Sequence, residues 1–215
     1  LPSIFSDNMV LQQNFDVTVW GSAEAGQEVN IIPSWGELVK TSTNDEGKWS
    51  AKIRTPGAGG PYELKVVCGV DSIQYKNILM GEVWLCSGQS NMEMPLAGWP
   101  PSDTIFTAAN EIPIANYPNL RFFTVDRATA ISPEEDCEGS WSLCSPSTAS
   151  TFSATAFFFG KKLMTDLNVP IGLIHSSWGG SPIEAWMGAE PLSKFPEYAE
   201  YIKGMEKFKE ESEKL

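Results

Sequence analysis

The chain has 215 residues, enough for one large domain or two smaller ones with a buried core. Hydrophobic residues make up 42% of it and aromatic residues 11%, a composition typical of packed globular proteins and not of disordered chains. A net charge of −12 argues against nucleic acid or anionic lipid as a partner, because both are bound by clustered Lys and Arg. No apolar run has the length of a membrane span, so we expect no membrane insertion.

Residues 1–80 predict an all-β domain. Short runs of alternating polar and apolar residues, such as Asp16–Trp20 and Tyr62–Val66, have the period of two that a half-buried strand shows. Turn-forming residues separate these runs, for example the glycine and proline cluster Pro56–Pro61. Short strands at such regular spacing indicate a small β-sandwich.

The pattern changes near residue 81, where continuous apolar runs replace the alternating ones. The runs that indicate buried strands are Val83–Cys86, Leu120–Val125 and Pro170–Ile174. A helix is predicted before the last of them, at Phe152–Asn168, and the order strand, helix, strand indicates a parallel sheet. We therefore expect residues 81–215 to form part of an α/β domain.

Two helices can be placed in this second part. The helix at Phe152–Asn168 should bury one apolar face, made by Phe152, Ala156, Phe159 and Leu163 at positions i, i+4, i+7 and i+11. A charged helix is predicted at the end of the chain, over Phe195–Leu215. Its expected ion pairs are Glu206 with Lys209 and Glu210 with Lys214.

Polar, glycine-containing segments follow two of the predicted strands, at Ser87–Asn91 and at His175–Ser181. In open parallel sheets, ligands bind beyond the carboxyl ends of the strands, so Ser90 would face the Gly179-Gly180 turn if the two strands are neighbours. A serine becomes a nucleophile when a base accepts its proton and backbone N–H groups stabilise the oxyanion. Paired glycines allow the close backbone approach that this requires. An ordinary strand-to-helix turn is the alternative reading.

The chain contains a single histidine, His175, and we expect it to be structural or to line the pocket, since it lies at a strand end. Cys68 and Cys86 lie in apolar runs and should be buried thiols. Cys137 and Cys144 lie in a loop-like stretch and could pair in an exported protein. The cysteines are too scattered for metal-ligand spacing, so we expect neither a metal nor another cofactor.

Several segments together resemble one family. They are FSDNMVLQ (Phe5–Gln12), GEVWLC (Gly81–Cys86), GQSNMEM (Gly88–Met94), PIGLI (Pro170–Ile174) and SSWGGSPIEAW (Ser176–Trp186). In these segments the chain is similar to the sialate O-acetylesterase family of SGNH-type carbohydrate esterases. The resemblance implies an SGNH-like three-layer α/β hydrolase domain with a parallel sheet, incomplete in this chain, preceded by the small β-sandwich.

The resemblance also implies roles for residues at the two turns. Ser90 would be the nucleophile that forms an acyl-enzyme, and the N–H groups of Ser90 and of Gly180, or alternatively Gly179, would hold the oxyanion. We expect an acetylated sugar as the substrate. The neighbouring residues that would bind it are Gln89, Asn91, Trp178, Ser181 and Glu184.

Members of the family carry the catalytic base in an Asp-x-x-His element and a further oxyanion donor in a Gln-Gly-Glu-type motif. Neither motif occurs in this sequence. The leading interpretation is therefore the N-terminal part of a secreted or periplasmic serine esterase, whose Asp and His come from a C-terminal remainder. A second chain that supplies the histidine is another possibility. A non-catalytic carbohydrate-binding protein that retains an esterase-like pocket is the alternative from a different class.

Overall fold

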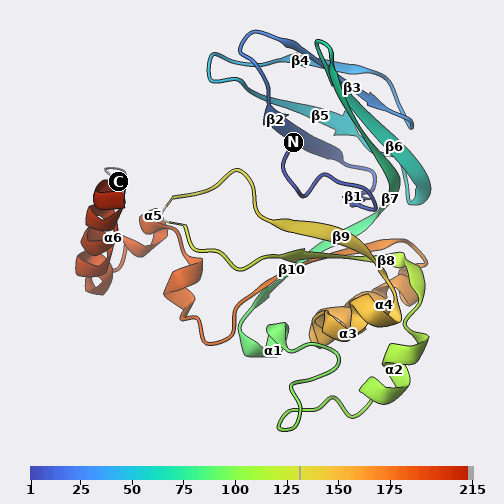
Figure 1. Ribbon diagram of the computed structural model, residues 1–215, viewed down its shortest axis with the longest axis vertical. Coiled ribbons are helices and arrows are strands. Elements are labelled where there is room, and N and C mark those ends of the chain that lie inside the picture. Colours follow the sequence, from blue (N-terminus) through green and yellow to red (C-terminus); the bar gives the residue numbers. More distant parts are fainter. Residues whose placement is uncertain (131, 213–215) are drawn as a thin grey trace.

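The computed structural model describes residues 1–130 and 132–212 and shows a mixed α/β protein. The N-terminal part is all β, as predicted, and the later part combines strands with helices (Figure 1). The strands of the N-terminal part are β1 (Val10–Gln12), β2 (Asp16–Ser22), β3 (Glu28–Pro33), β4 (Val39–Ser42), β5 (Lys48–Arg54) and β6 (Gly59–Cys68).

Two sheets share the core of this N-terminal part. Strand β2 pairs antiparallel with β5, while β3 pairs antiparallel with both β4 and β6. One buried apolar cluster contains Val19 and Ile53 from the first sheet and Val29 and Leu64 from the second. The alternating sequence pattern suits this arrangement, because successive side chains of a strand point to opposite faces.

Strand β7 (Asp71–Gly88) joins the two parts of the chain and runs through the division predicted at residue 81. Its first half pairs antiparallel with β6, and its segment Glu82–Gly88 pairs parallel with β10 (Ile171–Ser177). A Cβ atom on Gly81 would lie 1.9 Å from the carbonyl oxygen of Pro170, so only glycine fits where the backbones of Gly81 and Pro170 lie against each other. One continuous strand thus connects the two parts, with no linker between them.

The sheet of the later part contains β7, β10, β8 (Tyr117–Val125) and β9 (Gly139–Cys144). Strand β10 lies between β7 and β8 and is parallel to both, as the strand–helix–strand order predicted. The expectation of a wholly parallel sheet is wrong, because β9 pairs antiparallel with β8. No described helix lies between β8 and β9, and a connection without a crossover favours antiparallel pairing.

Helices α1 (Ser90–Glu93), α2 (Ala108–Ile114), α3 (Pro146–Thr151) and α4 (Ala154–Leu167) lie on one face of this sheet, and the N-terminal strands lie on the other (Figure 1). Neighbouring residues of β8 contribute to both sides. Phe122 is buried in the cluster under the helices, whereas Phe123 is buried in the cluster shared with the N-terminal part.

Helix α4 begins later than predicted, and its predicted apolar face is confirmed in part, because Phe152 and Ala156 are buried and Leu163 packs against the cluster under the helices. Ser153 caps its N-terminus by accepting a hydrogen bond from the Ala156 N–H, so Phe152 precedes the helix. The buried residues of α4 are Ala154, Ala156, Phe157 and Gly160. Phe159, predicted on the buried face, is 39% exposed, and its ring packs edge-on against Trp84 of β7.

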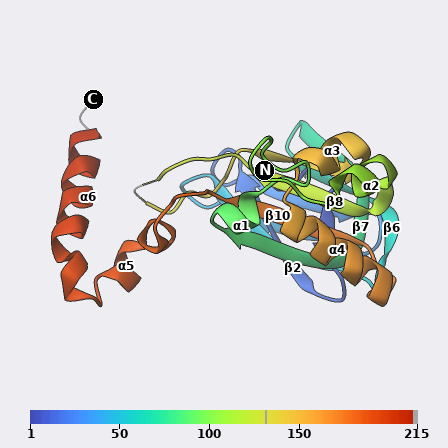
Figure 2. The same cartoon turned by 90° about the horizontal axis from the view of Figure 1, so that it is seen from below.

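The last described segments are η1 (Ile183–Trp186), α5 (Ala189–Leu192), η2 (Pro196–Tyr198) and α6 (Ala199–Ser212). Helix α6 starts after the predicted Phe195, because a separate 3₁₀ turn comes first, and it lies away from the sheet (Figures 1 and 2). The side chains of the predicted ion pairs Glu206/Lys209 and Glu210/Lys214 lie outside the part of the chain whose side chains the structure describes. None of the described helices is both long and apolar enough to cross a membrane.

The suggested pairing of Cys137 with Cys144 is wrong, since all four cysteines are free. Strand β9 runs from Gly139 to Cys144 between the two thiols. An extended chain rises about 3.3 Å per residue, whereas a disulfide needs Cα atoms within about 7 Å of each other. Cys144 is buried under the helices, while Cys137 packs against the N-terminal core.

Candidate functional site

The two polar segments singled out in the sequence meet at one edge of the sheet. Strands β7 and β10 are parallel neighbours, and their registered ends are Gly88 and Ser177. The chain continues from Gly88 into α1 and from Ser177 into the glycine turn, where the Trp178 N–H donates to the Gly88 carbonyl at 3.0 Å. This edge is where open parallel sheets place their ligands.

Ser90 is the first residue of α1 and is exposed. The turn that delivers it depends on Gly88, whose φ of +149° favours glycine, and a Cβ there would lie 3.4 Å from the Cβ of Met92. The helix continues only to Glu93, and the Met94 N–H closes it by donating to the Ser90 carbonyl. The turn therefore presents the serine hydroxyl at the surface above the strand end.

Gly179 packs directly against this serine. A Cβ atom on Gly179 would lie 3.0 Å from Ser90 Oγ and 2.5 Å from Glu93 Oε2, so no larger residue fits without displacing one of them. The Gly179 N–H is already engaged, because it donates to Glu93 Oε2 at 2.9 Å. Gly180 is exposed with a φ of +80°, and its N–H has no hydrogen-bond partner among the described residues. This geometry favours Gly180 over Gly179 as an oxyanion donor.

A charged group that sequence reasoning missed completes this corner. The Glu93 carboxylate turns back to accept the Gly179 N–H and forms an ion pair with Arg127. The Arg127 guanidinium in turn lies over the Trp178 ring, 5.5 Å from its centroid. The available signal was the spacing of Ser90 and Glu93, since residues at i and i+3 share one face of a helix.

Three of the predicted substrate-binding residues form a connected turn. The Gln89 side chain donates to the Ser181 carbonyl, and the Ser181 hydroxyl donates to the Trp178 carbonyl at 2.6 Å. The Trp186 indole N–H donates to the same hydroxyl oxygen, Ser181 Oγ, at 2.7 Å. The two strand-end segments are therefore joined on both sides of Ser90.

The other two predicted residues are placed differently. Asn91 is exposed on α1, and its carbonyl accepts a hydrogen bond from the Thr155 hydroxyl at 2.8 Å. Glu184 accepts a hydrogen bond from the Tyr198 hydroxyl, which lowers the pKa of Glu184 and raises the pKa of Tyr198. This bond directs the Glu184 carboxylate toward η2, and Glu184 makes no hydrogen bond with Ser90 among the described residues.

His175 lies within β10 and is 8% exposed. Its Nε2 shares a hydrogen bond of 2.6 Å with Ser177 Oγ, and its ring packs edge-on against Phe152 at a centroid distance of 5.3 Å. Burial lowers the pKa of His175, an effect partly opposed by a hydrogen bond with the Met92 backbone. A neutral, buried imidazole bonded to Ser177 fits the structural role expected from the sequence.

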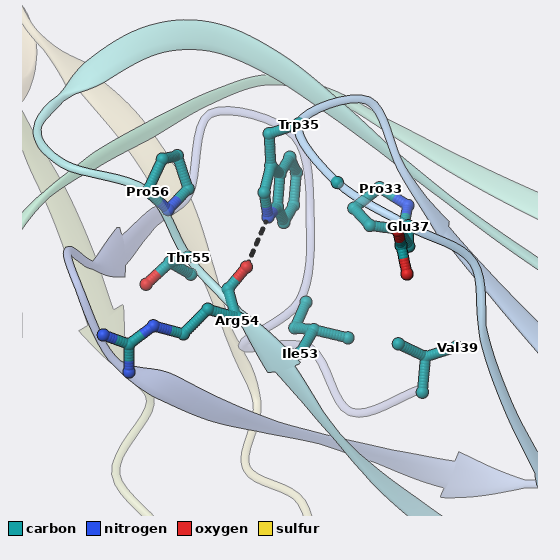
Figure 3. A pocket seen from close by; sticks show the side chains of 9 residues that line it. Pro33, Trp35, Glu37, Val39, Ile53, Arg54, Thr55 and Pro56 are labelled. Carbon is teal, nitrogen blue, oxygen red and sulfur yellow. Dashed lines mark hydrogen bonds between the residues drawn. The ribbon is translucent and has the colours of Figure 1, made fainter.

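Among the described residues, no group of three or more His, Cys, Asp or Glu side chains could hold a metal ion. A cavity of about 350 Å³ lies in the N-terminal part, with Trp35, Ile53 and Val39 in its wall (Figure 3). The Trp35 indole donates to the Arg54 carbonyl at 3.1 Å there. None of the predicted site residues lines this cavity.

Comparison with known proteins identifies relatives of the whole arrangement. No known family profile matches the chain. Sialate O-acetylesterases from Rattus norvegicus and Homo sapiens are each 32% identical to it over 211 residues, and the match covers 88% of this chain. The crystal structure of a carbohydrate acetylesterase from Xanthomonas citri superposes with a TM-score of 0.84 at 34% identity, over 90% of this chain and 43% of that one.

The mixed sheet thus has an α/β fold that resembles that of a carbohydrate acetylesterase. The similarity to the sialate O-acetylesterase family, inferred from the sequence motifs, is confirmed over 88% of the chain. The chain spans 38% of the length of the rat relative and 39% of the human one.

Proposed function

We propose that this chain provides the nucleophile and oxyanion donors of a serine esterase that removes O-acetyl groups from sialic acid or another acetylated sugar. The observation that carries the proposal is the contact between Ser90 and the Gly179-Gly180 turn at the ends of two parallel strands. The names of the relatives, sialate O-acetylesterase and carbohydrate acetylesterase, supply the substrate class.

In this proposal, Ser90 Oγ attacks the carbonyl carbon of the acetyl group. The oxyanion that forms is held by the N–H groups of Ser90 and Gly180, which stabilise the transition state most strongly when they point at the developing charge. The C–O bond to the sugar then breaks, the sugar oxygen takes up a proton, and an acetyl-enzyme is left. Water attacks the acetyl-enzyme, which releases acetate and returns the proton to Ser90.

A base must carry the proton between these steps, and we propose that it comes from outside the present chain. His175 is the only histidine, and its Nε2 is bonded to Ser177. A C-terminal remainder or a second chain would contribute Asp and His. The edge of β7 supports this: among the described residues, Glu82–Gly88 pairs with β10 alone, and Trp84 and Leu85 are 43% and 67% exposed. An unpaired strand edge with exposed apolar side chains is a surface suited to further strands.

The SGNH-like completion of the sheet, the treatment of residues 1–80 as a separate β-sandwich domain, and a secreted or periplasmic location belong to the same proposal. The shared core of the two N-terminal sheets supports the sandwich. Expression of the corresponding gene, followed by cell fractionation, tests the location.

A non-catalytic carbohydrate-binding protein is the second candidate. The feature that favours it is the bonding of His175 to Ser177, which leaves Ser90 without a histidine partner among the described residues. Such a protein would bind acetylated sugars at the same strand ends without hydrolysing them.

The test is acetate release from an O-acetylated sialic acid and from an acetylated neutral sugar. Five samples are compared: the chain alone, the chain with the family's C-terminal segment added, both again with Ser90→Ala, and the chain alone with His175→Ala. The proposal expects trace activity from the chain alone, strong activity from the combined form, and none after Ser90→Ala. Full activity of the chain alone that His175→Ala abolishes would make His175 the base. Sugar binding without hydrolysis in every sample supports the second candidate.

A further inference from the structure

The carboxylate of Glu93 lies between the two turns that meet at Ser90. Its Oε2 accepts the Gly179 N–H at 2.9 Å, and its Oε1 forms an ion pair with Arg127. The Glu93 side chain is only 15% exposed, although α1 is a short helix with no fully buried residue. A carboxylate that accepts a backbone N–H makes a charge-assisted hydrogen bond, which is stronger than one between neutral groups.

This bond fixes the glycine turn relative to the nucleophile. Ser90 and Glu93 lie on the same face of α1, three positions apart, and both side chains touch the space beside the Gly179 Cα atom. With the Gly179 N–H bound to Glu93, the next peptide group, that of Gly180, has a defined position relative to Ser90. A mobile turn would not hold the Gly180 N–H in that position. A misplacement of about 1 Å can cost about 100-fold in rate.

Arg127 supplies the charge that makes this arrangement compatible with an oxyanion. A lone carboxylate next to the oxyanion would repel it, and the repulsion grows where water is excluded. The Arg127 guanidinium pairs with Glu93 and lies over the ring of Trp178, the residue before Gly179. The pair is therefore locally neutral and is packed on the turn that it holds.

We propose that Glu93 is a positioning residue that holds the Gly179-Gly180 turn against the nucleophile helix, and that Arg127 neutralises Glu93 so that its charge does not oppose the oxyanion. The inference rests on the proposed function of Ser90. It assigns no proton transfer to Glu93, whose oxygens are occupied by Gly179 and Arg127.

The first measurement is hydrogen exchange of the Gly179 amide, by NMR on the glycine-labelled 215-residue chain. Glu93→Gln keeps an acceptor oxygen, so the amide should stay protected. Glu93→Ala removes the acceptor, so the amide should exchange faster by about tenfold or more, as an amide without its hydrogen bond does. Unchanged exchange in Glu93→Ala would overturn the proposed contact without any reference to activity.

The second measurement is the rate at which a fluorophosphonate modifies Ser90 in the chain combined with the family's C-terminal segment, mapped by peptide mass. Glu93→Ala should react about 10- to 100-fold more slowly, because the oxyanion donor is no longer held in place. Arg127→Met should also be slow, since it leaves an unpaired carboxylate beside the site. The double variant Glu93→Gln/Arg127→Met should react faster than Arg127→Met alone, which a merely structural ion pair does not predict.

The matched control is Glu111→Gln, which breaks the Glu111–Lys161 ion pair of 2.5 Å away from the site and should leave the rate unchanged. Equal rates for Glu93→Ala and the unsubstituted chain, or a double variant slower than Arg127→Met, would overturn the positioning role. No modification of Ser90 in the unsubstituted combined form would instead contradict the proposed function, and the exchange measurement alone would then decide whether Glu93 holds the turn.

Discussion

Ser90 and Gly179 lie so close together that a Cβ atom on the glycine would be 3.0 Å from the serine oxygen. The two residues are far apart in the sequence but follow the ends of neighbouring parallel strands. The contact leaves room for a backbone but not for a side chain, so the turn after β10 can bring its peptide groups up to the nucleophile. This closeness underlies the predictions that concern the site.

Substitution Gly179→Ala should disrupt the site without unfolding the protein. The added methyl group would lie 2.5 Å from Glu93 Oε2 and 3.0 Å from Ser90 Oγ, so the turn must move away. In the chain combined with the family's C-terminal segment, we expect fluorophosphonate modification of Ser90 to slow by about 100-fold, the cost of losing one oxyanion donor. Gly36→Ala is the control, because its Cβ meets only Pro33 at 4.0 Å. A Gly179→Ala variant that reacts at the normal rate would show that the turn does not serve Ser90.

The pKa of His175 should lie below the ordinary value of 6.5, because burial disfavours the charged imidazolium. As the only histidine, it gives a single resolved titration by NMR. The unfolded chain then binds the proton at a higher pH than the folded one. The neutral, buried His175 therefore contributes to the free energy of unfolding above about pH 6.5, and this stabilisation is lost as the pH falls toward the folded pKa.

Urea unfolding at a series of pH values measures this loss of stability, and His175→Gln should remove the component that sets in just below pH 6.5, the ordinary histidine pKa. A His175 pKa at or above the ordinary value would contradict the buried environment and would reopen the case for His175 as a base.

Substitution Gly160→Ala should destabilise the packing of α4 on the sheet. Its Cβ would lie 2.6 Å from Leu173 Cδ1 and 3.0 Å from Leu120 Cδ1, two side chains of the buried cluster. Alanine favours a helix by up to about 1 kcal/mol over glycine, but overpacking a core costs about 1–3 kcal/mol. We expect a net loss of about 1 kcal/mol in the free energy of unfolding. Gly204→Ala in α6, whose Cβ has nothing within 4 Å, should cause no loss.

Thiol reactivity should divide the four cysteines into two groups. Burial raises the pKa of Cys86 and of Cys144 to about 11, so few thiolates are present at neutral pH. The expectation of a buried Cys68 thiol is wrong, since Cys68 is partly exposed, as is Cys137, and both should react before Cys86 and Cys144 with a thiol reagent. Mass spectrometry of the native and the denatured chain counts the labels. Denatured protein that lacks labels on Cys137 and Cys144 without prior reduction would show the disulfide that the fold excludes.

Local sequence patterns predicted the elements that bury one face or both. The alternation in Asp16–Trp20 and the apolar run at Pro170–Ile174 are direct consequences of burial, so β2 and β10 could be predicted without the fold. Strand β9 was missed because Gly139–Cys144 is short and rich in serine, and only its pairing with β8 makes it a strand. The continuity of β7 through residue 81 could not be predicted, because the sequence changes there from alternating to continuous apolar residues although the strand does not end.

The same distinction holds at the site. Ser90 and the paired glycines could be found because each follows an apolar strand, and the parallel order then brings them together. Glu93 could not be assigned, because its role depends on the close approach of Gly179 and Arg127 from other elements. Its position on the helix was visible in the sequence, but its partners were not.

The central claim is that Ser90 is a nucleophile that forms an acetyl-enzyme, and trapping that intermediate tests it most directly. The chain, combined with the family's C-terminal segment that supplies the base, is mixed with an activated acetyl ester, quenched in acid after short times, and digested for mass spectrometry. The account predicts one added acetyl group on the peptide that contains Ser90, formed in a burst and absent in Ser90→Ala. Acetylation that persists in Ser90→Ala, or that is found only on lysines, would contradict it.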